Sequence, residues 1–355
     1  MKLGRPQKDI TFNSYPDSLS ALGRARVSGQ VLDSDGSTLD KNGTLLINVY
    51  DSEREKAYWV GSSKIMSYNI EGPLVYRGSA SITGGEFDFE FITPLDINYG
   101  GQSAKIVTYA VFDSTDGIGL VDSLPISDSI IISTDTVGPV ISYNFSGRSN
   151  FISGDAVKNG ETLEIVLADS SGINLVGGLG HGITLEIDHH PENMINLSNH
   201  FEYEKDDFTS GLLTYKLENL EPGEHHFKIK AWDNANNSSS TTFTAQVVSQ
   251  GYLAINNLLN YPNPMSENTT FYFELTQQVE KFSLAIYTLS GKQIKYFNRY
   301  GLNADNYPNT NLELNWDGRD AEGDRVATGV YIYKAMAVPV TGEAVESFGK
   351  IVVIN

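Results

Sequence analysis

The 355-residue sequence contains no cysteine. Disulfide bonds, thiolate metal sites and cysteine nucleophiles are therefore excluded for these residues. No run of about eighteen apolar residues is present, which is the length that a transmembrane helix requires. The first six residues lack the apolar core of a signal peptide. If the protein is exported, we expect its signal to lie upstream, which would make this sequence a fragment of a longer chain.

Helical periodicity is missing as well. No window repeats apolar residues at helical spacing over three turns without a Gly, Pro, Asn or Asp. The chain contains 19 Tyr and 16 Phe, which favour the half-buried surfaces of strands. A net charge of −19 opposes phosphate binding, so no nucleic-acid partner is expected. The composition therefore predicts an all-β chain.

Alternating segments support this fold class. Residues 86–91 place Phe87, Phe89 and Phe91 on one face and three acids on the other, as in a strand with one solvated face. Residues 105–112 are apolar on both faces and are predicted to be a central strand. Several such strands, separated by Gly and Asp turns, predict a β-sandwich.

Stretches rich in Gly, Pro and polar residues separate groups of predicted strands and suggest the domain limits. Residues 1–20 have no period and are predicted to be a linker, and residues 21–136 a first β-sandwich domain. Residues 137–249 contain about seven short segments of strand character, which is typical of an immunoglobulin-like domain. Residues 250–355 form the third unit. We thus expect three immunoglobulin-like β-sandwich domains in series.

Catalytic motifs are absent from the sequence. It has no Gly-x-Ser-x-Gly, no His-Glu-x-x-His and no phosphate-binding loop ending in Gly-Lys-Ser/Thr. All six histidines lie between positions 181 and 226, without the His-x-His or His-x₃-His spacing of a metal site. His181, in a Gly-His-Gly sequence, is expected to cap a loop. The sequence predicts no enzyme activity for these residues.

Two aspartates follow corresponding strand ends in the middle unit. Asp169 and Asp233 occupy these places, and Asp135 lies in the preceding connection. Oxygen ligands on converging loops can bind Ca²⁺. The alternative is that each carboxylate bonds its own backbone in an Asx turn. Both interpretations stay open, and no other metal or cofactor is expected.

Five blocks in the last hundred residues occur in a characteristic order. They are residues 260–264 (Asn-Tyr-Pro-Asn-Pro), 286–292, 316–320 (Trp-Asp-Gly-Arg-Asp, with Gly323), 328–334 and 350–353. This region resembles the C-terminal sorting domain of the type IX secretion system of Bacteroidetes-type bacteria. It departs from that pattern at Met265, where the family often has Phe, and by an insertion around residues 302–308.

Two sets of segments in the upstream units support a second resemblance: residues 84–94 with Tyr109-Ala110, and residues 180–184 with residues 220–225. They resemble the first and second β-domains in the post-catalytic part of the gingipain-like sortase of that system, a cysteine peptidase. The resemblance implies a non-catalytic chain preceded in cis by the peptidase domain, whose His–Cys dyad has no counterpart here. It also implies docking of the last domain to a PorV-like outer-membrane shuttle barrel and other secretion components. The implied location is the cell surface and outer membrane, after export through the periplasm.

Candidate sorting and partner-binding residues follow from the matched blocks. They are Asn260, Pro262, Asn263, Pro264, Trp316, Asp317, Gly318, Gly329, Tyr331 and Lys350. Trp316 continues the apolar face of its strand and is also a core candidate. The prolines are expected to fix the entry into the first strand of the domain. The turn residues and the terminal segment near Lys350 are the expected contacts.

Two other interpretations of function remain. The chain could be the end of a secreted cargo, such as an adhesin or a peptidase, whose sorting domain is cleaved off. It could also be a carbohydrate-binding accessory module, which would require an exposed aromatic platform on one sandwich face.

Overall fold

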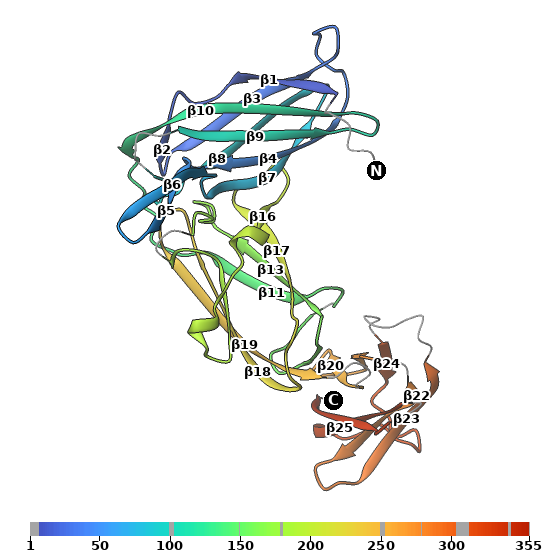
Figure 1. Cartoon of the computed structure of the whole chain (residues 1–355). Coiled ribbons are helices and arrows are strands. Elements are labelled where there is room, and N and C mark those ends of the chain that lie inside the picture. Colours follow the sequence, from blue (N-terminus) through green and yellow to red (C-terminus); the bar gives the residue numbers. More distant parts are fainter. Residues whose placement is uncertain are drawn as a thin grey trace. The chain divides into compact units, whose positions relative to one another are not determined.

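The computed structural model describes residues 7–98, 103–148, 150–177, 180–248, 253–277, 279–302, 312–339 and 342–354. Within these ranges the regular elements are strands and two short 3₁₀ helices, Pro191–Asn193 and Ser198–His200 (Figure 1). The predicted all-β class is confirmed. None of the described helices is long and apolar enough to cross a membrane. The predictions made for residues 1–6, 249–251 and 303–308 lie outside the described residues.

Two compact units make up the chain. Unit 1 comprises Met1–Tyr143, Glu164–Tyr215 and Phe227–Thr242, and unit 2 comprises Asn144–Leu163, Lys216–His226 and Phe243–Asn355. Because this division does not follow the predicted limits at 136/137 and 249/250, those limits stay predictions.

One eight-stranded sheet dominates unit 1. Its order is β7 (Leu74–Ile82), β4 (Gly43–Tyr50), β9 (Ser103–Val111), β10 (Asp116–Ile130), β1 (Lys8–Ser14), β3 (Arg24–Leu32) and β8 (Glu86–Ile92), with β2 (Leu19–Ala21) on β10. The end strands β7 and β8 contact each other, so the sheet curves into a nearly closed barrel (Figure 1). A two-sheet immunoglobulin-like sandwich is thus not confirmed for residues 21–136.

The residue pattern correctly predicted strands β8 and β9 of this sheet. In β8, Phe87, Phe89 and Phe91 are buried and Glu86 and Asp88 are exposed, as expected. Strand β9 lies between β4 and β10, which confirms its central position. Its second face is not covered, however, since its side chains alternate between buried and exposed toward the end of the strand.

The predicted linker at residues 1–20 is wrong for residues 8–14, which form a strand. Residues Lys8–Ser14 form strand β1, which pairs in parallel with β10 and antiparallel with β3. Ile10 and Phe12 are half-buried and alternate with exposed residues over this short stretch. Flanking prolines at positions 6 and 16 obscured that short period in the sequence.

Two further sheets follow in the middle of the chain. One has the order β11 (Val140–Phe145), β13 (Thr162–Ala168), β17 (Ser210–Lys216) and β16 (Glu202–Tyr203). The other has the order β12 (Ala156–Lys158), β19 (Ser238–Val248), β18 (Gly223–Trp232), β14 (Thr184–Ile187) and β15 (Ile195–Asn196).

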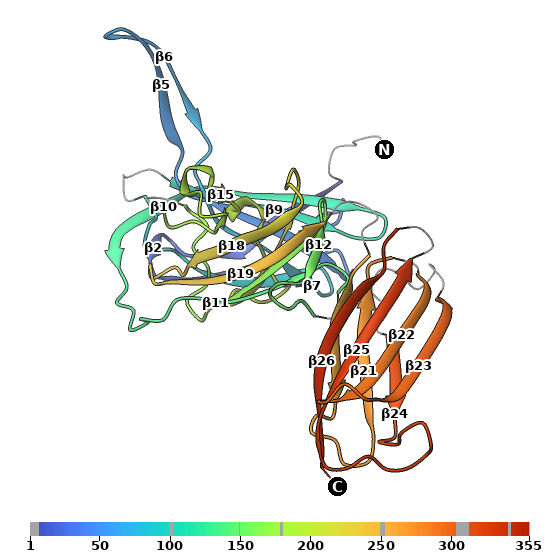
Figure 2. The same cartoon turned by 90° about the horizontal axis from the view of Figure 1, so that it is seen from below.

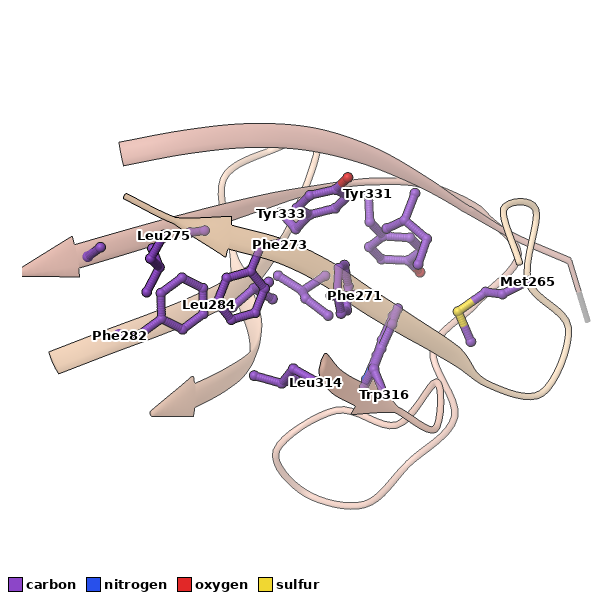
Figure 3. Close-up of a cluster of buried hydrophobic side chains, with 14 of the residues drawn as sticks. Met265, Phe271, Phe273, Leu275, Phe282, Leu284, Leu314, Trp316, Tyr331 and Tyr333 are labelled. Carbon is purple, nitrogen blue, oxygen red and sulfur yellow. The ribbon is translucent and has the colours of Figure 1, made fainter. Parts of the chain in front are cut away.

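The last part of unit 2 consists of two sheets over one core. The first sheet has the order β20 (Ile255–Tyr261), β21 (Thr269–Leu275) and β24 (Leu312–Trp316). The second sheet has the order β23 (Gln293–Leu302), β22 (Val279–Thr288), β25 (Gly329–Pro339) and β26 (Val345–Val353). Phe273 stacks on Phe282 with ring centroids 4.0 Å apart, and Phe271 meets Tyr333 edge-on (Figure 3). Aromatic residues from both sheets thus form the centre of this core.

A candidate docking end in residues 253–354

The Asn-Pro segment connects β20 to β21. Residues 259–261 are the end of β20, so the segment is not an entry into the first strand, and this expectation was wrong. Both peptide bonds before Pro262 and Pro264 are cis. The buried Asn260 side chain donates through Nδ2 to Pro262 O (3.3 Å) and to Thr269 Oγ1 (3.0 Å), and Thr269 Oγ1 donates to Pro262 O (2.9 Å). Side chains therefore hold a connection whose prolines have no N–H to donate.

Asn263 joins this connection to the terminal strand. Its Nδ2 donates to Lys350 O at 2.9 Å, and Val352 N donates to its Oδ1 at 3.0 Å. Met265 N then donates to Val352 O, and Ile354 N donates to Met265 O, both at 2.9 Å. Residues 263–265 thus form a short parallel partner for the end of β26.

The Trp-Asp-Gly turn packs onto the same place. Trp316 is 1% exposed, and its Nε1 donates to Arg319 O at 2.8 Å. Gly318 has a φ of +71°, and a Cβ there would lie 3.0 Å from the end of the Met265 side chain. Met265 is itself buried in the core, which accommodates the departure from the usual Phe. Trp316 therefore anchors the turn, and Gly318 permits its close approach.

The two remaining blocks complete the same end of the sandwich. Thr288 pairs with Tyr331, and Tyr331 pairs with Ile351. Gly329 pairs with Val353, beside the bridge from Met265 to Val353. The Tyr331 hydroxyl donates to Ala327 O at 2.7 Å, in the segment just before β25. All five blocks, separated along the sequence, thus meet at one end. We call this place the docking end.

Exposure divides the ten predicted residues into two groups. The exposed ones are Pro262, Asn263, Pro264, Asp317 and Lys350, whereas Asn260, Trp316, Gly318 and Tyr331 are buried and Gly329 is half-buried. The exposed group can touch a partner, and the buried group supports it. Tyr261 (71% exposed) and Ile354 (52% exposed) extend the exposed surface. Sequence reasoning missed both, although Tyr261 lies inside the first block.

A second candidate site lies in unit 1. One carboxylate oxygen each of Asp135, Asp169 and Asp233 lie within 4.8 Å of one another, a set of hard ligands that fits Ca²⁺. The oxygens also make the predicted local bonds: Ser171 N donates to Asp169 Oδ1 (2.7 Å), and Asn237 N and Nδ2 donate to the two oxygens of Asp233 (both 2.7 Å). The geometry therefore accommodates both the calcium and the Asx-turn interpretations.

Burial of this cluster changes its acidity. Desolvation raises the pKa of Asp169 to about 6, with added repulsion from Asp233 and Asp135. Desolvation also raises the pKa of Asp233, whereas the hydrogen bond from the Ser171 hydroxyl lowers the pKa of Asp135. The folded structure thus favours the protonated form of Asp169 and Asp233 and the ionised form of Asp135.

His181 participates in a partly buried polar network in unit 1. Its Nδ1 lies 2.6 Å from Asp96 Oδ2, and its ring lies 4.3 Å from the Trp232 ring between centroids. Asp96 also accepts hydrogen bonds from Asn174 Nδ2 (3.0 Å) and Asn236 Nδ2 (2.7 Å). The contact of His181 with Asp96 therefore holds the His181 loop in place. Among the described residues, the three-aspartate cluster is the one group that could bind a metal ion.

Comparisons with known proteins give structural likeness only. No model of a protein family matches, and no curated protein matches. The dimeric latent PorU from Porphyromonas gingivalis matches with a TM-score of 0.41 and 24% identity over 98% of this chain and 34% of that chain. A tetra-tandem repeat in the extending region of a large adhesion protein matches with a TM-score of 0.21 and 11% identity, over 98% of this chain and 74% of that chain. The chicken CNTN1 FN1–FN3 domains match with a TM-score of 0.19 and 11% identity, over 97% of this chain and 98% of that chain.

This chain spans about a third of the length of the PorU chain that it matches. At these identities and TM-scores the matches do not assign the chain to a family.

Proposed function

We propose that this chain is the non-catalytic C-terminal region of a PorU-like surface sortase, and that residues 253–354 dock it to the type IX secretion and attachment complex. The observation that carries the proposal is the convergence of the five sequence blocks at the docking end. These blocks lie far apart in the sequence, yet they surround one patch of surface, as residues that serve a common contact would. Any peptidase activity would belong to a part of the full-length protein outside this sequence.

The partner in this proposal is a PorV-like outer-membrane barrel. Asn263, Asp317 and Lys350 would make the polar contacts, because they are exposed at the docking end. Trp316 and Tyr331 would act indirectly, by holding the turn and strand that carry these groups. The protein would then reside at the cell surface, attached to the outer membrane.

A binding experiment tests the proposal. The 355-residue protein is titrated against the purified barrel in nanodiscs, with Lys350→Glu and Asp317→Lys as variants. Each is expected to weaken binding at least fivefold, because each reverses a charge at the docking end. The matched control is Arg299→Glu on β23, an exposed residue that pairs with Phe282 away from the docking end. Equal binding by all four proteins would contradict the proposal.

Intact-mass analysis separates the sortase from the cargo interpretation. A sortase is expected to keep residues 253–354 at the cell surface, whereas a cargo would lose them by cleavage. Recovery of the surface protein without this part would favour the cargo.

A further inference from the structure

Strands β7 and β8 form a hairpin that opens beyond its turn. At the turn, Thr83 and Glu86 exchange two backbone hydrogen bonds, of 2.9 and 3.1 Å, and form an isolated bridge. Beyond this bridge the two strands have no ladder with each other in the described part of the chain, although they remain in contact. The sheet therefore stops short of closure and leaves a gap between its two end strands.

The segment that follows β16 covers the β7 side of this gap. Asp206 N donates to Ser79 O at 2.9 Å, and the Asp206 carboxylate accepts from Ser81 N and Ser81 Oγ, both at 2.6 Å. This segment thus occupies the edge of β7 near residues 79–81. Among the described strands, none pairs with the corresponding side of β8.

Strand β8 directs backbone hydrogen-bonding groups into the gap. Successive residues of an antiparallel strand turn their N–H and C=O groups alternately to its two sides. Those of Glu86 point to Thr83, which is the gap side, so those of Asp88 and Glu90 point the same way. Within the described residues no strand pairs with them there. The gap therefore exposes a strand edge to which a further strand can be added.

A groove with a volume of about 690 Å³ runs along this edge. The rings of Tyr76, Phe87 and Phe89 at its floor are buried in the core, so its accessible lining is polar. No basic side chain of the described residues lines it, and five carboxylates do: Glu86, Asp88, Glu90, Asp206 and Asp207.

Most of these carboxylates are not neutralised. Glu90 is paired with Arg24 and Arg26, but the other four form no ion pair within the described ranges. Lys205 is close to them in sequence, yet its Nζ donates to Thr44 Oγ1 at 3.2 Å instead. Five carboxylates less the paired one leave a charge of −4 along the groove.

The projecting hairpin of unit 1 does not cover the groove. It consists of β5 (Arg54–Val60) and β6 (Ser63–Ile70), and Figure 2 shows it extending away from the rest of the unit. None of its residues lines the groove. The side chains of Glu86, Asp88 and Asp206 are exposed, so an incoming chain can reach them.

We propose that this groove binds an extended basic segment of another protein, which adds to β8 as a further strand. The backbone of the segment pairs with Asp88 and Glu90. Every second side chain projects beside Glu86 and Asp88, where Lys or Arg forms cross-strand ion pairs. The alternate side chains face the packed floor and are therefore small, such as Ser or Ala.

Charge and backbone together select this partner. Acidic chains, nucleic acids and lipid phosphates are repelled by four unpaired carboxylates. A metal ion satisfies carboxylates but leaves the strand edge unpaired. An extended basic chain satisfies both, and the inference is independent of the function proposed for residues 253–354.

Fluorescence anisotropy of labelled peptides added to the 355-residue protein tests the proposal. A synthetic peptide that alternates Lys and Ser is expected to bind, and to bind more weakly as salt is added. Glu86→Lys/Asp88→Lys is expected to weaken binding at least tenfold. The matched control Asp113→Lys/Asp122→Lys reverses two exposed charges outside the groove and is expected to change binding less than twofold.

Modified peptides separate strand addition from simple attraction of charges. One peptide is N-methylated at every Lys and another at every Ser, so both keep the full charge. Only one of these sets of N–H groups can face β8, so one of the two peptides is expected to bind at least tenfold more weakly. Equal binding of both modified peptides and the parent peptide would overturn the proposal.

Amide hydrogen exchange locates the contact in the wild type and needs no substituted protein. The Lys–Ser peptide is expected to slow exchange at Asp88 and Glu90, whose N–H groups face the groove. Exchange at Phe87 and Phe89 is expected to stay unchanged, because these residues already pair with β3. No protection at Asp88 and Glu90, or equal peptide binding by both double variants, would also overturn the proposal.

Discussion

The side chain of Asn263 takes the place of a backbone peptide group beside Val352. Val352 N donates to Asn263 Oδ1 at 3.0 Å, and Asn263 Nδ2 donates to Lys350 O at 2.9 Å. The amide thus offers one acceptor and one donor, as a neighbouring strand would. This pair of bonds fixes the exposed surface of the docking end to the terminal strand.

Removal of this amide should loosen the end of β26. Asn263→Ala loses both bonds, and we expect the free energy of unfolding to fall by about 1 kcal/mol. The direct measurement is hydrogen exchange of the backbone amides at residues 350–354, which should accelerate. The exposed Asn268→Ala is the control and should shift stability by less than about 0.5 kcal/mol. Unchanged exchange in Asn263→Ala would contradict this role.

A glycine opposite a tyrosine gives a second prediction. A Cβ at Gly349 would lie 2.2 Å from the ring of Tyr333, its cross-strand partner. Gly349→Ala should therefore destabilise the last sandwich by about 1–3 kcal/mol, as overpacking does. Urea unfolding followed by Trp316 fluorescence measures this change. Tyr333→Leu in the same chain should recover part of the loss, and no recovery would show that the ring is not the obstacle.

The network around Asp96 gives a third prediction. Asp96→Ala removes the shared acceptor of His181, Asn174 and Asn236 and leaves their donors without it. We expect a loss of about 1–2 kcal/mol in unit 1, because three hydrogen bonds of a partly buried network are removed. Thermal unfolding followed by Trp232 fluorescence measures it. Asp113→Ala at an exposed position is the control, and equal midpoints for both variants would argue against the network.

The acidity of Asp169 gives a prediction on pH. Its pKa rises from 3.8 in a free side chain to about 6 in the folded protein, so the folded state binds the proton more tightly. Its contribution to stability is therefore present below pH 3.8 and is lost as the pH rises to about 6. Asp169→Asn should stabilise the protein at pH 7 by about 1 kcal/mol, after allowance for partial solvent exposure, and not at pH 4. Denaturant midpoints at the two pH values check this difference.

Calcium distinguishes the two interpretations of the aspartate cluster. If Asp135, Asp169 and Asp233 bind Ca²⁺, millimolar Ca²⁺ should raise the thermal midpoint at pH 7, and chelator should reverse the effect. Asp169→Asn should abolish the shift. If Ca²⁺ leaves the thermal midpoint of the wild type unchanged, the calcium interpretation is wrong and the Asx-turn interpretation remains.

Local alternation explains which elements the sequence could predict. Strand β8 was predicted because Phe87, Phe89 and Phe91 face a core while acids face solvent, and period two needs no tertiary information. Strand β1 was missed because its period covers only Ile10 and Phe12. The hairpin of β5 (Arg54–Val60) and β6 (Ser63–Ile70) was missed, because the sequence alone does not show that its apolar side chains stay exposed. Whether a given strand pairs with a sheet depends on the whole fold.

The candidate site shows the same limit. The sequence located the five blocks and ranked Trp316 as a core candidate, which its 1% exposure matches. It could not place Asn263 beside Lys350 and Val352, because these contacts join residues almost ninety positions apart. Only the pairing of β26 with β25 and with residues 263–265 brings them together.

The position of β26 has a consequence for the order of folding. The bonds of Asn263 and Met265 to this strand close a loop of 87 to 89 residues, and such contacts form late because chain entropy must be overcome first. Residues 345–354 must therefore be in place before the docking end exists at all. A partner that touches Asn263 and Lys350 together would recognise only chains whose last sandwich has finished folding. In the docking proposed above, the same surface would therefore report that the last sandwich is complete.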